Sequence, residues 1–566
     1  VNTNERFYIP VNGVPSYFVA SVSAYRDNET RALASHQGSM FSDTRLDWSN
    51  RYGAHDWHVF GGARVQMESY SLNTQVGYNT GNDKTPFMSS SLLNANNGGS
   101  DDKWNSWAWY AQGEYNYLQR YYLQLNATAE TSSRFGKDAI NSIKAFGAPW
   151  TMFYGAQGAW VVSNESWMAG VEPIDYLRIS AGYDVSGNDD IDYYAARSYF
   201  RAFKFMNSIS GIAFDNIGNS ELQAEITRRF NVGLETNLLK NRLSIRLNGF
   251  ISNTDNLLTF QSLGFLSGLE YNWSNGGALS NRGVDASVVG KLIAAKNFQW
   301  EMGVSAGHYK NKITRLADNK TFMDTQLYGA TIRTEVGQAA NLFYGYETEG
   351  VFATSEQAAE SGLYILAENG VDKKPFGAGD VIFKDNHEDG AIDAKDMVVI
   401  GDPNPDIYGN LFSAMSYKRF RLDVNFNYSL GNDVYNYMRS QLEGGNRFMN
   451  QTTAMLHRWQ AEGQQTSMPR ATFQDPMGNA RFSDRWIEDG SYLRLKSATL
   501  SYNLPINSTF IQGFQFWVQA NNVFTLSKYL GSDPEFAATS NVIGQGIDLG
   551  QLSQSRSIVA GIKINL

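Results

Sequence analysis

Apolar and polar residues alternate along the chain in stretches of about ten residues. Between residues 107 and 117, Trp107, Trp109 and the other odd positions are aromatic or small, whereas the even positions include Gln112 and Glu114. Successive side chains of a strand point to opposite faces, so this pattern predicts a strand with one apolar face and one wet face. The same alternation returns in residues 121–130, 243–251, 422–428, 514–521 and 558–566.

The lengths of these stretches and of their connections distinguish a membrane protein from a soluble one. A tilted strand needs about ten residues to cross a bilayer, whereas strands of soluble proteins more often have about five or six. Short connections at 118–120, 238–241 and 418–420 alternate with long excursions such as 431–490, as in outer-membrane barrels with short periplasmic turns. The sequence therefore predicts an all-β fold, a large antiparallel transmembrane β-barrel of about 18 strands with long extracellular loops, occupying residues 1–566 as one domain.

Composition agrees with this interpretation. Aromatic residues make up 14% of the 566 residues and charged residues only 18%, with 52 Gly, a mixture typical of strands between lipid and water. The sequence contains no run of 18 or more consecutive apolar residues, so it predicts no transmembrane helix. The net charge of -9 argues against a nucleic-acid partner, and the absence of cysteine excludes thiol chemistry. A secreted soluble β-protein remains an alternative.

The stretch "DNHEDGAIDAKD", residues 385–396, follows the template of a calcium-binding loop. A glycine at the sixth position allows the sharp turn, and carboxylates supply hard oxygen ligands for Ca²⁺ or, second, Mg²⁺. The stretches on both sides read as strands, so we expect a structural clip on an extracellular loop rather than a switch. The alternative is a solvated acidic turn. The predicted ligands are Asp385, His387, Asp389, Asp393 and Asp396 through their side chains and Ala391 through its carbonyl.

The template is imperfect at two positions. His387 is a poor ligand for a hard cation, and Asp396 is one methylene shorter than the usual glutamate. Both changes should weaken binding or favour a smaller ion. Elsewhere the six His and the scattered Asp and Glu form no triad or zinc spacing, so we expect no enzyme activity.

Ten motifs together resemble the SusC-like TonB-dependent outer-membrane transporters, the nutrient-uptake barrels of the Bacteroidetes starch-utilisation type. They include "IGDPNPDIYGN" and "DGSYLRLKSATLSYNLP". Their order and spacing follow the family from about residue 100 onward. The motifs lie at residues 115–136, 177–191, 241–258, 277–288, 345–358, 385–396, 400–410, 431–436, 489–505 and 521–536.

The resemblance implies active import of a nutrient oligomer, an oligosaccharide or a peptide, through a 22-stranded barrel in the outer membrane. It implies a SusD-like surface lipoprotein over the barrel, TonB acting through an N-terminal plug, and dimers of transporter–lipoprotein pairs. The plug, the TonB-interacting box and the first strands are not recognisable in this sequence, so we expect them on a longer polypeptide or on a separate chain. Alternatives are a SusC-like scaffold in an assembly or secretion complex and a plugless diffusion pore.

Two loop segments are expected to be helical and to contact the lipoprotein. Residues 354–362 begin with a predicted capping box of Thr354 and Gln357, and residues 450–463 are predicted as a helix that stops at Gly463. The substrate site cannot be located from the sequence. Weak candidates for stacking on a sugar ring are Trp459, Trp486 and Trp517, with most aromatic residues expected in the membrane girdles instead.

Overall fold

The chain consists mainly of long antiparallel strands. The computed structural model describes residues 2–9, 29–78, 96–205, 209–263, 268–269, 271–506, 510, 513–539 and 542–565. Within it the chain divides into two compact units, residues 1–158, 182–228 and 254–276 in unit 1 and residues 159–181, 229–253 and 277–566 in unit 2. Over the described residues, the large sheet contains seventeen strands, close to the eighteen or so predicted. Among the described residues, no helix has the length and apolar character needed to cross a membrane.

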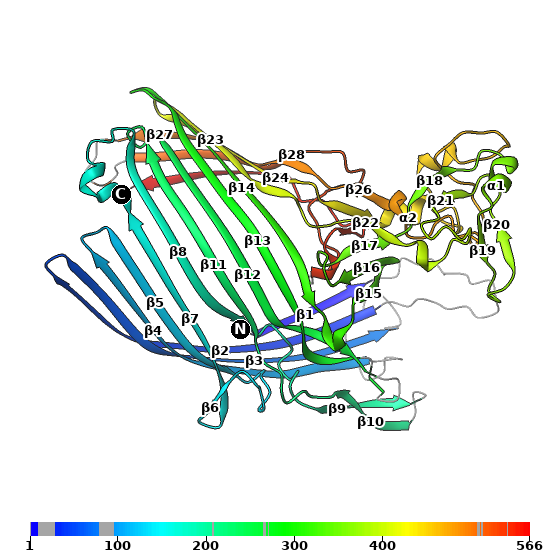
Figure 1. The fold of residues 1–566 in the computed structure, drawn as a ribbon, viewed down its shortest axis with the longest axis horizontal. Helices are drawn as coiled ribbons and strands as arrows, with labels where there is room; N and C mark the ends of the chain where they lie inside the picture. Colours follow the sequence, from blue (N-terminus) through cyan, green and yellow to red (C-terminus); the bar gives the residue numbers. More distant parts are fainter. Residues whose placement is uncertain are drawn as a thin grey trace. The chain divides into compact units, whose positions relative to one another are not determined.

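In unit 1, neighbours in sequence pair as antiparallel hairpins from β1 to β5. Strands β2, β3 and β4 run side by side over more than twenty residues (Figure 1). A short turn at 53–54 joins β2 to β3, and the short turn predicted at 118–120 joins β4 to β5. The strands of this unit are β1 (Asn2–Ile9), β2 (Glu29–Tyr52), β3 (His55–Tyr78), β4 (Asn96–Tyr117), β5 (Tyr121–Ser132), β6 (Ile143–Ala145), β9 (Tyr199–Phe205) and β10 (Ile209–Asn216).

Five strands contain residues of both units: β7 (Ala148–Val161), β8 (Ile174–Asn188), β11 (Glu225–Leu238), β12 (Leu243–Ser262) and β13 (Tyr271–Ala294). The turn between β11 and β12 is the predicted short connection. Leu239, Lys240 and Asn241 all have positive φ there, a conformation that only tight turns commonly require of side-chain-bearing residues.

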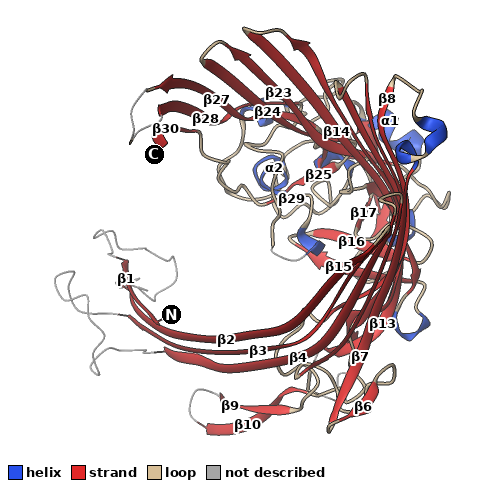
Figure 2. Ribbon diagram, turned by 90° about the vertical axis from the view of Figure 1, so that its left-hand side faces the viewer, coloured by secondary structure: helices blue, strands red, loops and turns tan. Residues whose placement is uncertain are grey.

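In unit 2, β13 pairs with β14 (Phe298–Arg315), which pairs with β23 (Ile407–Tyr417). The series continues through β24 (Phe420–Leu430), β27 (Tyr492–Pro505), β28 (Gly513–Ser527) and β30 (Ser557–Asn565), which lie side by side in Figure 2. The predicted turn at 418–420 joins β23 to β24. The predicted last strand is present up to Asn565; Leu566 lies outside the described residues.

The long loops of unit 2 form small sheets of their own. They contain β15 (Phe322–Leu327), β16 (Ala330–Glu335), β17 (Leu342–Gly345), β18 (Thr348–Val351), β19 (Tyr364–Leu366), β20 (Lys373–Pro375), β21 (Val381–Phe383), β22 (Val398–Gly401), β25 (Asp433–Asn436), β26 (Ile487–Asp489), β29 (Ile547–Asp548), α1 (Ser355–Ser361) and α2 (Tyr437–Glu443). Strands β21 and β22 flank the acidic loop, as predicted from "GDVIF" and "MVVI".

Of the two predicted helices, one is confirmed. Thr354 caps α1 by accepting a hydrogen bond from the Gln357 backbone N–H at 3.1 Å, and the helix ends at Gly362. The prediction for 450–463 is wrong, because only Thr453–His457 forms a short 3₁₀ turn. The backbone N–H of Trp459 instead donates to the carbonyl of Met468, a long-range partner that the local pattern does not reveal.

The predicted parity of the wall strands is visible in side-chain exposure. On β4, Trp109 is 50% exposed while its neighbour Ala108 is 4% exposed, and on β5 Leu125 is 50% exposed. Opposite residues of an antiparallel pair share a face, and Trp107 pairs with Val65 on β3. These apolar side chains form one continuous face, as a lipid-facing wall requires.

The dry core of unit 2 lies in the loops rather than in the wall. One cluster packs around Phe352, Phe376 and Phe383, and the other around Phe343 and Trp486. A wall that exposes its apolar side chains cannot bury them against itself, so the loops need separate cores to be ordered. The loops are therefore folded bodies that can present fixed side chains.

Candidate functional site

The acidic loop folds around its own backbone N–H groups. The Asp385 side chain accepts from Gly390 N–H at 2.7 Å, and Asp389 accepts from Ala391 N–H at 2.9 Å. The Asp396 carboxylate is fully buried and accepts from the N–H groups of both His387 and Asp393, while Asp393 accepts from Lys395 N–H. Gly390 has φ of 77°, which supports the sharp turn predicted at this position.

One carboxylate oxygen of this loop accepts no hydrogen bond. The Asp385 Oδ1 atom is buried and has no hydrogen-bond partner in the structure. Burial raises the pKa of this carboxyl, but the N–H groups of Gly390, Glu388 and Asp389 outweigh it and hold the pKa below its usual value. Asp385 therefore presents an ionised acceptor. No three carboxylate or imidazole groups converge as a metal site among the described residues, so metal binding stays a prediction.

Two of the three tryptophan candidates belong to loop packing. Trp486 is 1% exposed, and its Nε1–H donates to the Arg481 carbonyl. Its ring has no exposed face on which a sugar could stack, so the prediction of Trp486 as a sugar-binding residue is wrong. Trp459 is half-buried and donates through Nε1 to the Ala353 carbonyl. Trp517 on β28 is also half-buried, and its ring covers Gly561, where a Cβ would collide with it; it stays a candidate.

A cleft that sequence reasoning missed lies in unit 1. It has a volume of about 590 Å³. Asp102 projects into it from β4, on the parity opposite to the exposed Trp107 and Trp109, hence on the face away from lipid. The remaining lining comes from the loop after β8, from the start of β9 and from the start of β13. The cleft is lined by Asp102, Asp190, Ile191, Asp192, Tyr193, Tyr194, Tyr199 and Trp273.

Several contacts fix the cleft's aromatic side chains. The Trp273 Nε1–H donates to the Asp192 carboxylate at 3.2 Å. Tyr194 accepts from the Lys103 backbone N–H and donates to the Asp101 carbonyl, both at 3.2 Å. Below them, the loop is anchored by a buried cluster of Ile191, Ala195 and Leu222.

The Tyr193 ring also contacts a cation. The Arg134 guanidinium lies 5.0 Å from the Tyr193 ring centroid and 4.7 Å from that of Trp104, within the range of cation–π attraction. The same group donates to the Asp189 carbonyl at 3.0 Å. A cleft with fixed rings and carboxylates can stack on a sugar ring or an apolar side chain and accept hydrogen bonds from hydroxyl or ammonium groups.

The only signal for this cleft in the sequence is the density of aspartate and tyrosine in "NDDIDYYAARSYF", residues 188–200. The partners Asp102 and Trp273 are far away along the chain. Pairing of β4 with its neighbours and the entry into β13 bring them together, and neither can be read from local periodicity.

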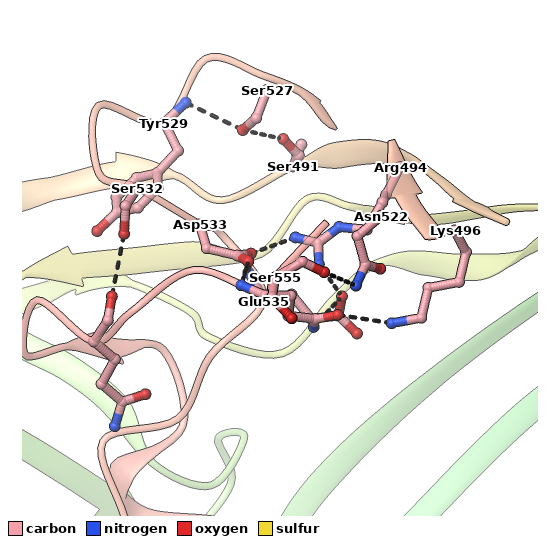
Figure 3. Close-up of polar contacts among 12 residues, drawn as sticks. Ser491, Arg494, Lys496, Asn522, Ser527, Tyr529, Ser532, Asp533, Glu535 and Ser555 are labelled. Carbon is pink, nitrogen blue, oxygen red and sulfur yellow. Dashed lines mark hydrogen bonds and ion pairs between the residues drawn. The ribbon is translucent and has the colours of Figure 1, made fainter. Parts of the chain in front are cut away.

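A buried ion-pair cluster orders the last loop of unit 2. Arg494 on β27 is 2% exposed and pairs with Asp533, and its Nη1 lies 3.0 Å from Glu535 Oε2 (Figure 3). Burial raises the pKa of Asp533, but the backbone N–H groups of Gln554 and Glu535 and the Arg494 guanidinium together hold that pKa below its usual value. The pair is therefore charged at neutral pH.

Comparisons with known proteins agree with this architecture. The model of the family described as "TonB dependent receptor-like, beta-barrel" matches residues 3–523. TonB-dependent receptor P3 of Formosa agariphila is 27% identical over 555 residues, covering 93% of this chain and 52% of the relative. TonB-dependent receptor SusC of Bacteroides thetaiotaomicron is 26% identical over 488 residues, covering 81% and 43%.

Among solved structures, the RagAB peptide importer in its closed-closed state matches with a TM-score of 0.79 at 21% identity. The match covers 100% of this chain and 58% of that chain. At this identity the likeness shows a shared fold. The chain spans about half the length of the curated relatives it matches.

Proposed function

Because the chain belongs to the TonB dependent receptor-like β-barrel family, whose members cross the outer membrane with strands, we propose that it imports a nutrient oligomer, a glycan or a peptide. It would do so as the barrel of a TonB-dependent transporter that works with a SusD-like lipoprotein, in dimers of such pairs. The family is one of transporters and not of enzymes, in agreement with the sequence-based expectation. The family match over residues 3–523 carries this proposal.

The cleft of unit 1 supports a role in binding the cargo. Its rings and carboxylates lie on the face of β4 away from lipid, at the end of the strand opposite to the short turn at 118–120. Short turns face the periplasm in such barrels, so the cleft would face the extracellular side. Stacking on an aromatic ring contributes about 0.5–1.5 kcal/mol in related contacts, which suits a site that must release its ligand.

We expect uptake to depend on TonB and on this cleft. In cells that carry the full-length protein, removal of TonB should abolish uptake of the cargo oligomer. The double variant Tyr194→Ala, Trp273→Ala should reduce uptake at low cargo concentration about fivefold, the loss of roughly 1 kcal/mol of stacking. The measurement is accumulation of fluorescent oligosaccharides and peptides.

The control is Tyr154→Ala on β7, an exposed residue outside the cleft. Uptake that continues without TonB would favour a diffusion pore. No uptake of any tested oligomer, with other outer-membrane proteins co-purifying, would favour the scaffold alternative.

We also propose that the loop 385–396 binds Ca²⁺, with Mg²⁺ as the second choice. The open Asp385 Oδ1 and the hard oxygens of Asp389, Asp393 and Asp396 support this. Their carboxylates are engaged by backbone N–H groups, so a bound ion would have to displace some of these bonds.

Calcium should stabilise the loop measurably. At a free concentration ten times the Kd, binding to the folded state alone contributes about 1.4 kcal/mol. Asp385→Asn should abolish this gain in stability. The control Asp372→Asn, which removes a carboxylate from the neighbouring β19–β20 hairpin, should retain it. Hydrogen exchange of residues 380–400 with and without Ca²⁺ is the measurement. Identical exchange in wild-type protein under both conditions would leave only the solvated acidic turn.

A further inference from the structure

A groove of about 600 Å³ opens on the lipid-facing side of unit 1. Val65 and Met67 on β3 and Trp107 on β4 contribute to its wall. Trp107 and Met67 are exposed, at 44% and 46%, and belong to the apolar parity of these strands. The groove therefore lies on the outer face of the wall and not on the face that carries the cleft.

Two cations line this groove. Lys137 comes from the loop after β5 and Arg197 from the loop after β8, and no carboxylate belongs to the described lining. Neither side chain forms an ion pair among the residues that the structure describes. By contrast, Lys144 on β6 pairs with Asp138 at 3.7 Å, and Arg134 lies 3.8 Å from Asp189. The groove thus combines an apolar wall with two uncompensated positive charges.

The backbone holds both cations in place. On either side of Lys137, Gly136 N–H donates to the Leu222 carbonyl and Asp138 N–H to the Ser220 carbonyl, both at 2.8 Å. At the other cation, the Asn216 side-chain amide donates to the carbonyl of Arg197 at 2.8 Å. The charges are therefore carried by fixed segments rather than by free loop tips.

The Asn216 amide has further acceptors in the same segment. It also donates to the carbonyls of Tyr194 and Ala195, at 3.3 and 3.2 Å, and Asn216 itself is buried. Next to it, Gly218 N–H donates to the Ser198 hydroxyl at 3.0 Å. This arrangement fixes the chain on both sides of Arg197.

The loop beside the groove exposes large apolar side chains. Ile140 is 70% exposed, Ile143 57% and Phe146 93%. Phe146 lies at the tip of the β6–β7 hairpin, which projects away from the wall strands β3, β4 and β5 (Figure 1). Side chains exposed in this way beside a lipid-facing wall are suited to contact acyl chains.

We propose that this groove binds a phosphate-bearing lipid of the outer leaflet. Its phosphate would lie between Lys137 and Arg197, and its acyl chains would run along Val65, Met67 and Trp107. Val65 and Trp107 lie ten residues along β3 and β4 from the short periplasmic turns, next to the level where β5 ends at Ser132. A tilted strand crosses the bilayer in about ten residues, so this is the level of the outer leaflet. Guanidinium and ammonium groups donate to phosphate oxygens, and the absence of carboxylates in the described lining removes the repulsion that such a headgroup would otherwise meet.

The test uses the full-length protein in a neutral detergent and native mass spectrometry. The probes are dioleoyl phosphatidic acid and dioleoylglycerol, which share acyl chains and differ in the phosphate. We expect the wild type to retain the first and not the second. Lys137→Glu or Arg197→Glu should lower the bound fraction by about fivefold or more, whereas the matched change Lys144→Glu should leave it unaltered.

Three results would overturn the proposal. Equal retention of dioleoylglycerol would show that the phosphate is not recognised, and unaltered binding by both groove variants would place the lipid elsewhere. The third result is displacement of the lipid by 10 mM inorganic phosphate, a concentration roughly a hundredfold above the Kd of a weak site of about 0.1 mM. This would indicate a site for a free anion. If a charge-reversal variant does not fold, Lys137→Gln provides the same comparison, with a smaller expected loss.

Discussion

Replacing Asp533 by alanine should unfold the last extracellular loop of unit 2 without removing the wall strands. Arg494 would then be left 2% exposed without its main counter-ion. Removing one partner of a buried ion pair costs about 3–5 kcal/mol, because the remaining charge has lost its compensation. Glu535 also lies near the guanidinium, so we expect the lower part of this range.

The measurement is hydrogen exchange of residues 528–556 in the full-length protein. Protection in this segment should fall by about a hundredfold or more, the equivalent of roughly 3 kcal/mol, while β27 and β28 keep theirs. The matched control is Glu535→Gln, since Glu535 is 35% exposed at its side chain and should cost little. A comparable loss of protection in both variants would show that the buried Asp533–Arg494 pair stabilises the loop no more than Glu535 does.

The sequence predicts those parts of the fold that depend on residues close together along the chain. The parity of the wall depends on neighbours two residues apart, so the exposure of Trp109 and Leu125 was predictable from alternation alone. The short turns and the strands that flank the acidic loop depend on similarly local signals. Helix α1 was predictable because Thr354 and Gln357 lie within one turn of each other.

The loop cores depend on contacts that local patterns do not contain. Trp486 was a candidate for sugar stacking, yet its ring is buried among residues from five separate segments of the loops. The helix expected over 450–463 fails for a similar reason, because Trp459 bonds to Met468 and to Ala353 instead of continuing the helix. The sequence alone therefore does not distinguish a loop tryptophan that packs in a core from one that binds a ligand.

The cleft of unit 1 shows the same limit for function. Asp102, Tyr194 and Trp273 meet only through strand pairing and loop folding, and the Asp- and Tyr-rich stretch around Tyr194 does not reveal the two distant partners. The acidic loop differs in that all its predicted ligands lie within twelve residues, so the prediction needs only local spacing; metal binding there stays a prediction. Its geometry now identifies Asp385 Oδ1 as the open position, which the spacing alone did not distinguish.

Leu247→Arg should destabilise the protein in a membrane, whereas Asn248→Arg should be mild. Leu247 is 44% exposed on β12, four residues after the strand begins at Leu243. At about 3.3 Å per residue and a tilt near 45°, it lies roughly 9 Å into an apolar band of about 25 Å. An arginine there costs about 2 to 4 kcal/mol toward the midplane.

The neighbouring position provides the control within the same strand. Asn248 points to the opposite face, where its amide lies 3.4 Å from Asp285, so an arginine there would meet a carboxylate and water. The measurement is the free energy of unfolding in urea of the full-length protein in phospholipid vesicles. Because both variants add the same side chain to adjacent residues, their difference reports which face touches hydrocarbon. Equal losses at the two positions would contradict the assignment of the apolar parity to lipid.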